Sequence, residues 1–554
     1  MAAFAGPILD YLGRMPILPL TLVVAASVTL VGAPPITPAA TTSAETRRAL
    51  WISLADKPLP RGGVRPEHTE LTPRALARRA QHRTMPGLVD ARDLPVDPAR
   101  LGAVLATGAR FRAKSRWLNG ISVDATDAEA RAIAALPFVA STWSLHRSHA
   151  VLPPVGVPAG DGDAGEGGVA GGHTAADYGL MYAQVQTAGI PPLHTRGFHG
   201  EGLVIGVLDT GFHRVHEAFH SAEHPLQVIA EWDFIGNDGN TGIEASDPAG
   251  QHQHGTWILG TLAAYRPGEA IGCAYAARYV LAKTEVVPTE TVVEEDYYVA
   301  GLEFIEAQGA DLATSSLGYI DWYTPAQLDG LTAITTRAVN LATANGLVCL
   351  TAAGNAGHDA DPATNRLLAP ADAFDVISCG AVDANGVIAG FSSDGPSADG
   401  RVKPELLARG VGTVSVHSTN PTGYQALNGT SLSTPIVAGA VALVKQARPE
   451  LGVTALRNLL FTNAGDWFAN GAADPLHVRG YGQVSAFGTA TSGRLPEDIN
   501  LDGTVGAVDL ARVLSAWGAC VQPDPVLGVC PEDLDGDGQI GAPDLARILS
   551  AWGG

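Results

Sequence analysis

The stretch GLVIGVLDTG, residues 202–211, decides the fold class. It is apolar until Asp209, which precedes a Thr-Gly turn. Three further runs have the same character: YVLAKT (279–284), LVCLTAAG (347–354) and VISCGAV (376–382). Continuous apolar runs are typical of strands that are buried on both faces, and helical stretches separate them. The alternation predicts an α/β domain over residues 176–490, with a parallel sheet and helices on both faces.

Polar residues at the carboxyl ends of such strands gather at one edge of the sheet. Asp209 ends the first run, and Asn355 follows Ala353 and Gly354 at the end of the third. His254 lies in His254-Gly255-Thr256, where a helix is expected to start. His252 lacks this Gly-Thr context, so we prefer His254 as the functional histidine.

Ser431 lies in NGTSLSTP (428–435), directly before the helix-forming run IVAGAVALVKQA (436–447). We expect Pro435 near the first helical turn, where its missing N–H costs little. Ser431 would then lie at a helix N-terminus, where backbone N–H groups and the helix dipole favour a developing anion. Taken singly, these motifs also suit a turn aspartate, a core histidine and an N-cap serine.

Together the motifs resemble the subtilisin-like serine proteases. The resemblance rests on Asp209-Thr210-Gly211, His254-Gly255-Thr256, Ala353-Gly354-Asn355-Ala356-Gly357, and Gly429-Thr430-Ser431 with Pro435, in the order Asp, His, Ser. It implies a subtilisin-like fold, a triad of Asp209, His254 and Ser431, and an oxyanion donor in Asn355. It also implies that Ser316, Leu317 and Gly318 bind the substrate main chain, and that Ala353 and Gly354 help to wall the pocket. Two departures, Leu432-Ser433 after the nucleophile and Trp257 after the histidine motif, would alter only the pocket rim.

The expected function is therefore that of a secreted serine endopeptidase that hydrolyses peptide bonds through an acyl-enzyme, with no cofactor needed for the chemistry. Its partners would be protein or peptide substrates. One alternative is an inactive scaffold of the same fold, which the complete triad and Asn355 argue against. Another is a lipase or esterase, but that motif needs glycine at position 433, which is Ser433, and a different triad order.

Residues 46–150 predict a smaller α/β unit. RALWISLADK (48–57) and residues 111–125 are strand-like, Thr72-Pro73 opens a helix, and Thr126 with Glu129 forms a capping box before a second helix. Residues 41–150 carry a net charge of +7 and residues 151–554 carry −28, so the two parts are expected to dock electrostatically. The unit resembles the pro-regions of these proteases, which implies a zymogen; a permanent N-terminal domain is the alternative. A Gly-rich linker follows at 151–175, and we expect the activating cut between about 147 and 175.

The first 40 residues have the plan of a signal peptide. Arg14 precedes an apolar run from Pro16 to Ala33, and small residues follow up to Ala40. Cleavage there predicts a secreted or cell-surface protein; an uncleaved segment would instead be a membrane anchor. The net charge of −21 argues against nucleic-acid binding.

Residues 494–554 contain an internal duplication. DINLDGTVGAVDLARVLSAWG (498–518) matches DLDGDGQIGAPDLARILSAWG (533–553) at a period of 35. The pair resembles dockerin-type calcium repeats, EF-hand-like loops each followed by a helix. That resemblance implies Ca²⁺, a hard cation that prefers oxygen ligands. The implied ligands are Asp498, Asn500, Asp502, Thr504 and Asp509 in the first loop, and Asp533, Asp535, Asp537, Gln539 and Asp544 in the second. The implied partner is a cohesin-like domain, although the long insert between the repeats makes cell-surface attachment equally suitable.

Five cysteines leave at least one unpaired within the chain. Cys520 and Cys530 are expected to form a disulfide in an oxidising compartment. Cys273, Cys349 and Cys379 fit buried small hydrophobes, and a bond between Cys349 and Cys379 stays open at this point.

Overall fold

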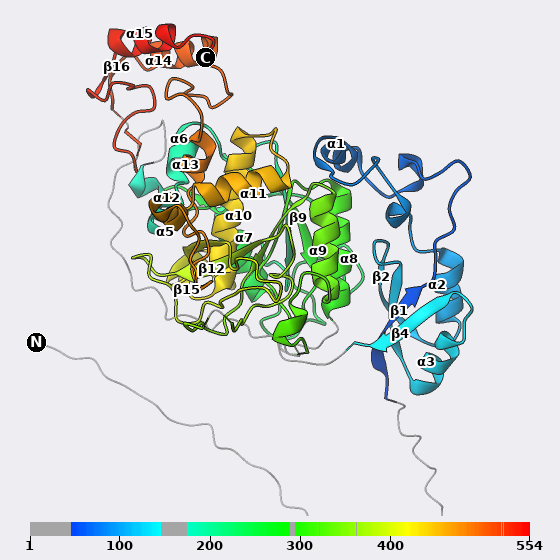
Figure 1. Cartoon of the computed structure of the whole chain (residues 1–554). Helices are drawn as coiled ribbons and strands as arrows, with labels where there is room; N and C mark the ends of the chain where they lie inside the picture. The colour runs from blue at the N-terminus through cyan, green and yellow to red at the C-terminus, as the bar shows by residue number, and fades with distance from the viewer. Residues whose placement is uncertain are drawn as a thin grey trace, which may run out of the picture. The chain divides into compact units, whose positions relative to one another are not determined.

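The computed structural model describes residues 46–145, 174–287, 294–320, 322–361, 363–521, 523–524 and 526–554 (Figure 1). The chain divides at Thr46, and every element below belongs to the unit Arg47–Gly554. The signal-peptide prediction and nearly all of the predicted linker lie outside the described residues. No helix in the described ranges has both the length and the apolar character needed to cross a membrane.

A four-stranded antiparallel sheet forms the N-terminal part, in the order β2-β3-β1-β4. Its strands are β1 (Arg48–Leu54), β2 (Arg110–Ser115), β3 (Gly120–Ala125) and β4 (Val139–Ser144). Helices α2 (Pro98–Leu105) and α3 (Asp127–Ala134) pack Val104 and Ile133 onto its core. The capping box is confirmed, since Thr126 N donates to Glu129 Oε2 at 2.8 Å. Helix α1 (Pro73–His82) begins where Thr72-Pro73 predicts, whereas α2, capped by Asp97, was missed.

The central sheet has seven strands, in the order β13-β12-β11-β10-β5-β9-β6, and every neighbouring pair is parallel. The strands are β5 (Val204–Asp209), β6 (Gln227–Asp233), β9 (Arg278–Lys283), β10 (Leu312–Ser315), β11 (Val348–Ala352), β12 (Ile377–Val382) and β13 (Leu406–Arg409). All residues of β5, β10, β11 and β12 are buried, as the continuous apolar runs predict. The predicted subtilisin-like α/β architecture is confirmed.

Helices cover both faces of this sheet, and alternate strand residues point into two separate cores. Ile205 and Val207 share one core with helices α7 (Gln253–Ala263) and α10 (Thr430–Ala447). Val204 and Leu208 share the other with helices α8 (Glu294–Gln308) and α9 (Ile334–Ala344). Figure 1 shows α8 and α9 together on one side of the strands and α7 and α10 on the other. The remaining elements of this part are α4 (Ala175–Tyr178), α5 (Tyr182–Thr187), α6 (Pro191–Thr195), β7 (Tyr265–Arg266), β8 (Ala270–Ile271), β14 (Thr413–Val416), β15 (Tyr424–Leu427), α11 (Val453–Thr462), α12 (Gly465–Asn470) and α13 (Ala486–Thr491).

The duplicated C-terminal segment forms a small core of its own. Helices α14 (Ala507–Ser515) and α15 (Ala542–Ser550) bury Val513 and Ile548, and β16 (Gly518–Ala519) pairs with β17 (Gln539–Ile540). The Cys520–Cys530 disulfide is present. Cys273, Cys349 and Cys379 are free and buried, so the open possibility of a bond between Cys349 and Cys379 is not realised.

Candidate active site

Asp209 and His254 meet at the carboxyl end of β5. His254 lies in the first turn of α7, and its Nδ1 lies 2.7 Å from Asp209 Oδ1. Both side chains are buried, and Thr210 N also donates to Asp209 Oδ1 at 2.7 Å. Gly255 permits this approach, because a Cβ there would lie 2.3 Å from Gly211 O. The pair is therefore a preorganised carboxylate–imidazole unit.

Ser431 is the second residue of α10, whose first helical residue is Thr430. Pro435 consequently lies in the second turn rather than the first. Because proline has no N–H, Ser431 O lacks the helical hydrogen bond that residue 435 would otherwise donate to it. Ser316 Oγ supplies that donor instead, at 2.8 Å from Ser431 O. In return Ser431 Oγ donates to Ser316 O at 3.2 Å. Ser431, at the start of α10, is thus held by hydrogen bonds to Ser316, the residue that follows β10.

In the described part of the chain, His254 Nε2 is buried and has no hydrogen-bond partner. Ser431 Oγ is turned to Ser316 O, so the structure shows the Asp209–His254 bond but not a bond from His254 to Ser431. Helices α7 and α10, which carry the two residues, pack against each other. Rotation of Ser431 about χ1 would break its hydrogen bond to Ser316 O and free its hydroxyl.

Asn355 follows β11 and contacts the first turn of α10. Its Oδ1 accepts hydrogen bonds from Thr430 N at 2.9 Å and from Thr430 Oγ1 at 3.0 Å. Both bonds engage the side-chain oxygen, so the NH₂ group of Asn355 remains available to donate to another acceptor. Sequence order alone could not have shown this orientation.

The predicted substrate residues lie beside this group. Leu317 is buried, and Gly318 packs so closely on Leu368 that a Cβ would lie 2.5 Å from it. Ala353 is fully buried, and Gly354 has a φ of +122°, a conformation that favours glycine. Both glycines are therefore required by the local packing.

Two neighbouring side chains test the finer expectations. His252 is the residue before α7 and packs its ring on His213 at 4.9 Å, so it makes no part of the Asp209 pair. Trp257 is only 7% exposed and lies in the core, with its ring centroid 6.2 Å from that of His254. It backs the imidazole rather than forming a rim of the pocket.

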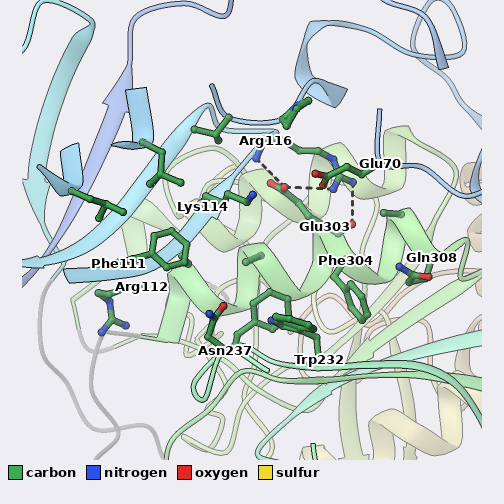
Figure 2. A pocket seen from close by; sticks show the side chains of 18 residues that line it. Glu70, Phe111, Arg112, Lys114, Arg116, Trp232, Asn237, Glu303, Phe304 and Gln308 are labelled. Atoms are coloured by element: carbon green, nitrogen blue, oxygen red, sulfur yellow. Dashed lines mark hydrogen bonds and ion pairs between the residues drawn. The ribbon is translucent and has the colours of Figure 1, made fainter. Parts of the chain in front are cut away.

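The N-terminal part docks on α8 through buried ion pairs (Figure 2). Glu306, whose side chain is 0% exposed, is paired with Arg78, with Arg79 at 2.8 Å and with Arg116 at 3.1 Å. Burial opposes ionisation, but the arginines outweigh it and hold the pKa of Glu306 below its ordinary value. The electrostatic docking expected from the charge asymmetry is thereby seen residue by residue.

Two more carboxylates of α8 extend this interface. Glu303 accepts from the backbone N–H groups of Arg116 at 2.9 Å and Trp117 at 3.1 Å, and Asp296 pairs with Arg112 at 3.1 Å. Burial raises the pKa values of both carboxyl groups despite these partners. The interface also borders an open pocket of about 620 Å³, lined by charged, aliphatic and aromatic side chains, which belongs to this docking surface and not to the Asp209–His254 pair.

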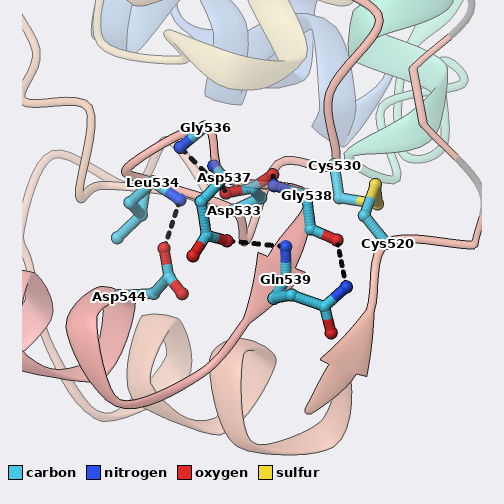
Figure 3. The surroundings of a disulfide bond; sticks show 9 residues. All are labelled: Cys520, Cys530, Asp533, Leu534, Gly536, Asp537, Gly538, Gln539 and Asp544. Carbon is cyan, nitrogen blue, oxygen red and sulfur yellow. Dashed lines mark hydrogen bonds between the residues drawn. A yellow bond between two sulfur atoms is a disulfide. The ribbon is translucent and has the colours of Figure 1, made fainter.

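The two predicted calcium loops have matching backbones. Asp498 accepts from Asp502 N and Gly503 N, and Asp533 accepts from the equivalent Asp537 N and Gly538 N (Figure 3). The twelfth residues, Asp509 and Asp544, are fully buried and each accepts three backbone N–H groups. Asn500 and Asp502 are joined at 2.9 Å, and the predicted carbonyl ligands Thr504 and Gln539 follow the glycines at position 6.

Two groups of carboxylates in the described ranges have oxygens within 4.8 Å of one another. One is Asp533, Asp535 and Asp537, which the sequence predicted. The other, Asp233, Asp238 and Glu244, was missed because Asp233 ends β6 and the other two come from the irregular loop after it. There the ammonium of Lys283 lies 2.8 Å from Asp233 and supplies a cation.

The parallel-sheet fold, the Asp209–His254 pair and the N-terminal part docked on α8 indicate a serine peptidase with a pro-region. The subtilase family model matches residues 200–484, and the model of a peptidase S8 propeptide domain of Bacteroidota matches residues 49–152. The chain belongs to the subtilase family.

Individual relatives agree with this assignment. Subtilisin DY of Bacillus licheniformis is 34% identical over 300 residues, which cover 52% of this chain and 96% of that protein. Subtilisin E of Bacillus subtilis (strain 168) is 31% identical over 291 residues, covering 51% of this chain and 67% of subtilisin E. The crystal structure of fervidolysin from Fervidobacterium pennivorans shares the fold, with a TM-score of 0.55 at 22% identity. The match covers 80% of this chain and 61% of fervidolysin. The protein is a subtilisin-like serine endopeptidase with a propeptide, as a zymogen requires.

Proposed function

We propose that Asp209, His254 and Ser431 are the catalytic triad and that Asn355 donates to the oxyanion. One observation carries the assignment. The 2.7 Å contact to Asp209 engages His254 Nδ1, while Nε2 is buried with no hydrogen-bond partner in the described residues. An imidazole held in this way can accept a proton at Nε2.

The chemistry follows from these positions. Ser431 Oγ leaves Ser316 O, transfers its proton to His254 Nε2 and attacks the peptide carbonyl carbon. The carbonyl oxygen gains the negative charge, which the Ser431 backbone N–H and the Asn355 NH₂ group stabilise. The imidazolium, stabilised by Asp209, then protonates the leaving amine, and an acyl-enzyme remains for water to hydrolyse.

Labelling with a fluorophosphonate tests the assignment against the inactive-scaffold alternative. We expect one label at Ser431 in the processed protein and none in Ser431→Ala. Ser433→Ala is the matched control, because Ser433 is on the same helical turn and donates to Thr430 O at 2.9 Å. Absence of label in the wild type, or label that persists in Ser431→Ala, contradicts the triad.

We further propose the domain limits 1–40, 46–150, 151–175, 176–490 and 494–554 for the signal peptide, pro-region, linker, peptidase domain and repeat pair. Secretion after removal of residues 1–40 fits the disulfide, which an oxidising compartment favours. Activation by a cut between about 147 and 175 would separate the pro-region docked on α8. N-terminal sequencing of the protein from culture medium tests both cuts; a mature chain that begins before residue 46 refutes the pro-region cut.

For the C-terminal repeats we propose that each loop binds one Ca²⁺. The acidic positions 1, 3 and 5 of the second loop come within 4.8 Å of one another, and buried twelfth residues close both loops. Calcium titration of the Ser431→Ala protein should show two sites, and Asp498→Asn and Asp533→Asn should each remove one. Asp127→Asn in the pro-region is the control, and unchanged binding in both loop variants contradicts the proposal.

The repeat pair would attach the enzyme to a cohesin-like domain or to the cell surface. Supporting this, equivalent apolar residues of the two repeats are about half exposed: Leu514 and Leu549 at 51% and 56%, Trp517 and Trp552 at 51% and 50%. Binding of the full chain to cohesin domains and to cell envelopes, compared with the double variant Trp517→Ser and Trp552→Ser, distinguishes these partners. No binding to either partner refutes the proposal.

A further inference from the structure

Two buried glutamates contact the residues that follow the Ser316–Gly318 segment, which holds Ser431. Glu285 follows β9 and is 5% exposed, and Glu295 lies in the first turn of α8 and is 2% exposed. Tyr319, the residue after Gly318, donates its hydroxyl to Glu285 Oε1. The first carboxylate is therefore tied directly to the end of the Ser316–Gly318 segment.

Aromatic side chains join the second glutamate to the first. Tyr323 OH donates to Glu295 Oε1 at 2.9 Å, and Trp322 Nε1 donates to Glu295 Oε2 at 3.1 Å. The rings form a row, with centroids 5.9 Å apart for Tyr319 and Trp322 and 5.7 Å apart for Trp322 and Tyr323. We call Glu285, Glu295, Tyr319, Trp322 and Tyr323 the acidic cluster.

Glu295 differs from the other buried carboxylates of α8. Asp296, Glu303 and Glu306 each pair with an arginine, whereas no Lys, Arg or His forms an ion pair with Glu295 in the described ranges. Its donors are a phenol and an indole, both neutral. Burial raises the pKa of Glu295 to about 8. A positive guest would stabilise the ionised carboxylate, and aromatic faces favour a cation as well.

The position of the acidic cluster corresponds to a substrate residue close to the cut. Ser316 contacts Ser431, and Tyr319 lies three residues further along the segment that would bind an extended substrate. An extended chain rises about 3.3 Å per residue, so Tyr319 lies roughly three substrate residues from the cleaved bond.

We propose that Glu285 and Glu295 form a subsite that selects a lysine or arginine side chain, two to four residues on the N-terminal side of the cleaved bond. The inference rests on the proposed triad and substrate segment, and it adds a class of substrate. Sequences with a basic residue at that distance before the cut are the preferred ones.

The chain's own pro-region has a matching sequence. Its last described residue, Leu145, is buried in the same apolar cluster as Leu317 and Tyr319. The residues that follow in the sequence are His146, Arg147, Ser148 and His149, whose placement lies outside the described residues. A segment that follows Leu145 and carries positive charge is complementary to the acidic cluster, and the expected activating cut lies just beyond it.

Quenched fluorescent peptides that differ at one residue test the proposal. Lysine and norleucine, which have similar size but differ in charge, are exchanged in turn at the second, third and fourth residue before the cut. For the processed wild-type enzyme we expect kcat/KM to favour lysine at least tenfold at one of the three positions. In Glu285→Gln or Glu295→Gln this ratio should fall below about threefold, with cleavage of the norleucine peptide retained. Glu450→Gln removes the same charge from a side chain that is 56% exposed, and should keep the wild-type ratio.

The outcomes separate this subsite from the catalytic assignment. A wild-type enzyme that cleaves the peptides without preferring lysine at any position overturns the subsite and leaves the triad intact, whether or not the variants fold. A preference that persists in both glutamine variants also overturns it. Failure of the wild type to cleave any peptide, together with no fluorophosphonate label, would instead refute the triad.

Discussion

Glu306→Gln should loosen the pro-region from α8. The carboxylate is 0% exposed and pairs with three arginines from two parts of the pro-region, α1 and the segment after β2. The neutral amide keeps the shape of the side chain but leaves buried guanidinium groups without their main countercharge. Removing one partner of a buried ion pair costs about 3–5 kcal/mol. Asp93 and Glu303 still face Arg79 and Arg116, so we expect about 3 kcal/mol.

That free energy corresponds to roughly a hundredfold increase in the undocked population. The measurement is amide hydrogen exchange in the Ser431→Ala background, where the chain is expected to stay intact. Amides of α8 and α1 that are protected only by docking should exchange about a hundredfold faster in Glu306→Gln. Asp127→Asn is the control, because its pair with Arg48 has side chains that are 76% and 49% exposed and contributes under about 1 kcal/mol.

If the amides of α8 and α1 exchange in Glu306→Gln at rates within threefold of those in the parent protein, this reasoning is refuted. It would mean that apolar contacts hold the pro-region and that the ion pairs only offset their own desolvation. In the active chain, the same variant should shorten the delay before peptidase activity appears.

Three further predictions follow from the site and the repeats. Asn355→Ala should lower kcat about 10²–10³-fold with little change in KM, measured on the best peptide, because one oxyanion donor is lost; a loss mainly in KM would contradict that role. Glu295 should make the wild type less stable as pH rises from about 4.5 to 8, since the folded state keeps a proton that the unfolded chain has lost. Urea unfolding in the Ser431→Ala background should therefore show Glu295→Gln gaining stability relative to its parent across that window, and a constant difference would contradict it. The Asp533→Asn protein should keep only the first calcium site, whose loop contains Leu501, a residue that is 3% exposed and lies in the main core. Calcium chelation should therefore lower the thermal midpoint of the peptidase domain more in Asp533→Asn than in Asp498→Asn; equal shifts would contradict this coupling.

The strands and helix starts could be predicted from the sequence because local rules determine them. A run buried on both faces shows no polar alternation, so β5, β11 and β12 were readable from their apolar character. Thr72 and Thr126 indicate helix starts because their hydroxyls accept backbone N–H groups at the first turn. Pro435 was placed a turn too early, because the helix begins at Thr430 and a side chain from another segment replaces the missing donor.

The ion pairs and the acidic cluster depend on contacts that no local rule contains. Arg79 and Glu306 are 227 residues apart, and only net charge indicated that the two parts attract. The spacing of Asp296, Glu303 and Glu306 on α8 places them on one helical face, a signal that the sequence did hold. Glu285 and Glu295 come from separate elements, so only the fold shows that both contact the residues that follow the Ser316–Gly318 segment.

Under our proposals, consecutive residues of helix α8 serve pro-region docking and substrate choice. Asp296 pairs with Arg112 of the pro-region, while Glu295 accepts from Trp322 and Tyr323 on the peptidase side. When the pro-region leaves, water can solvate Asp296, so the carboxylate loses its arginine without remaining a buried unpaired charge. Glu295 stays among aromatic rings, and under our proposal it gains a cation when a basic segment binds, whether that segment belongs to the pro-region or to a substrate. Docking of the pro-region body and recognition of a basic residue thus depend on different carboxylates of one helix, so Asp296→Asn should weaken docking without changing the preference for a basic substrate residue.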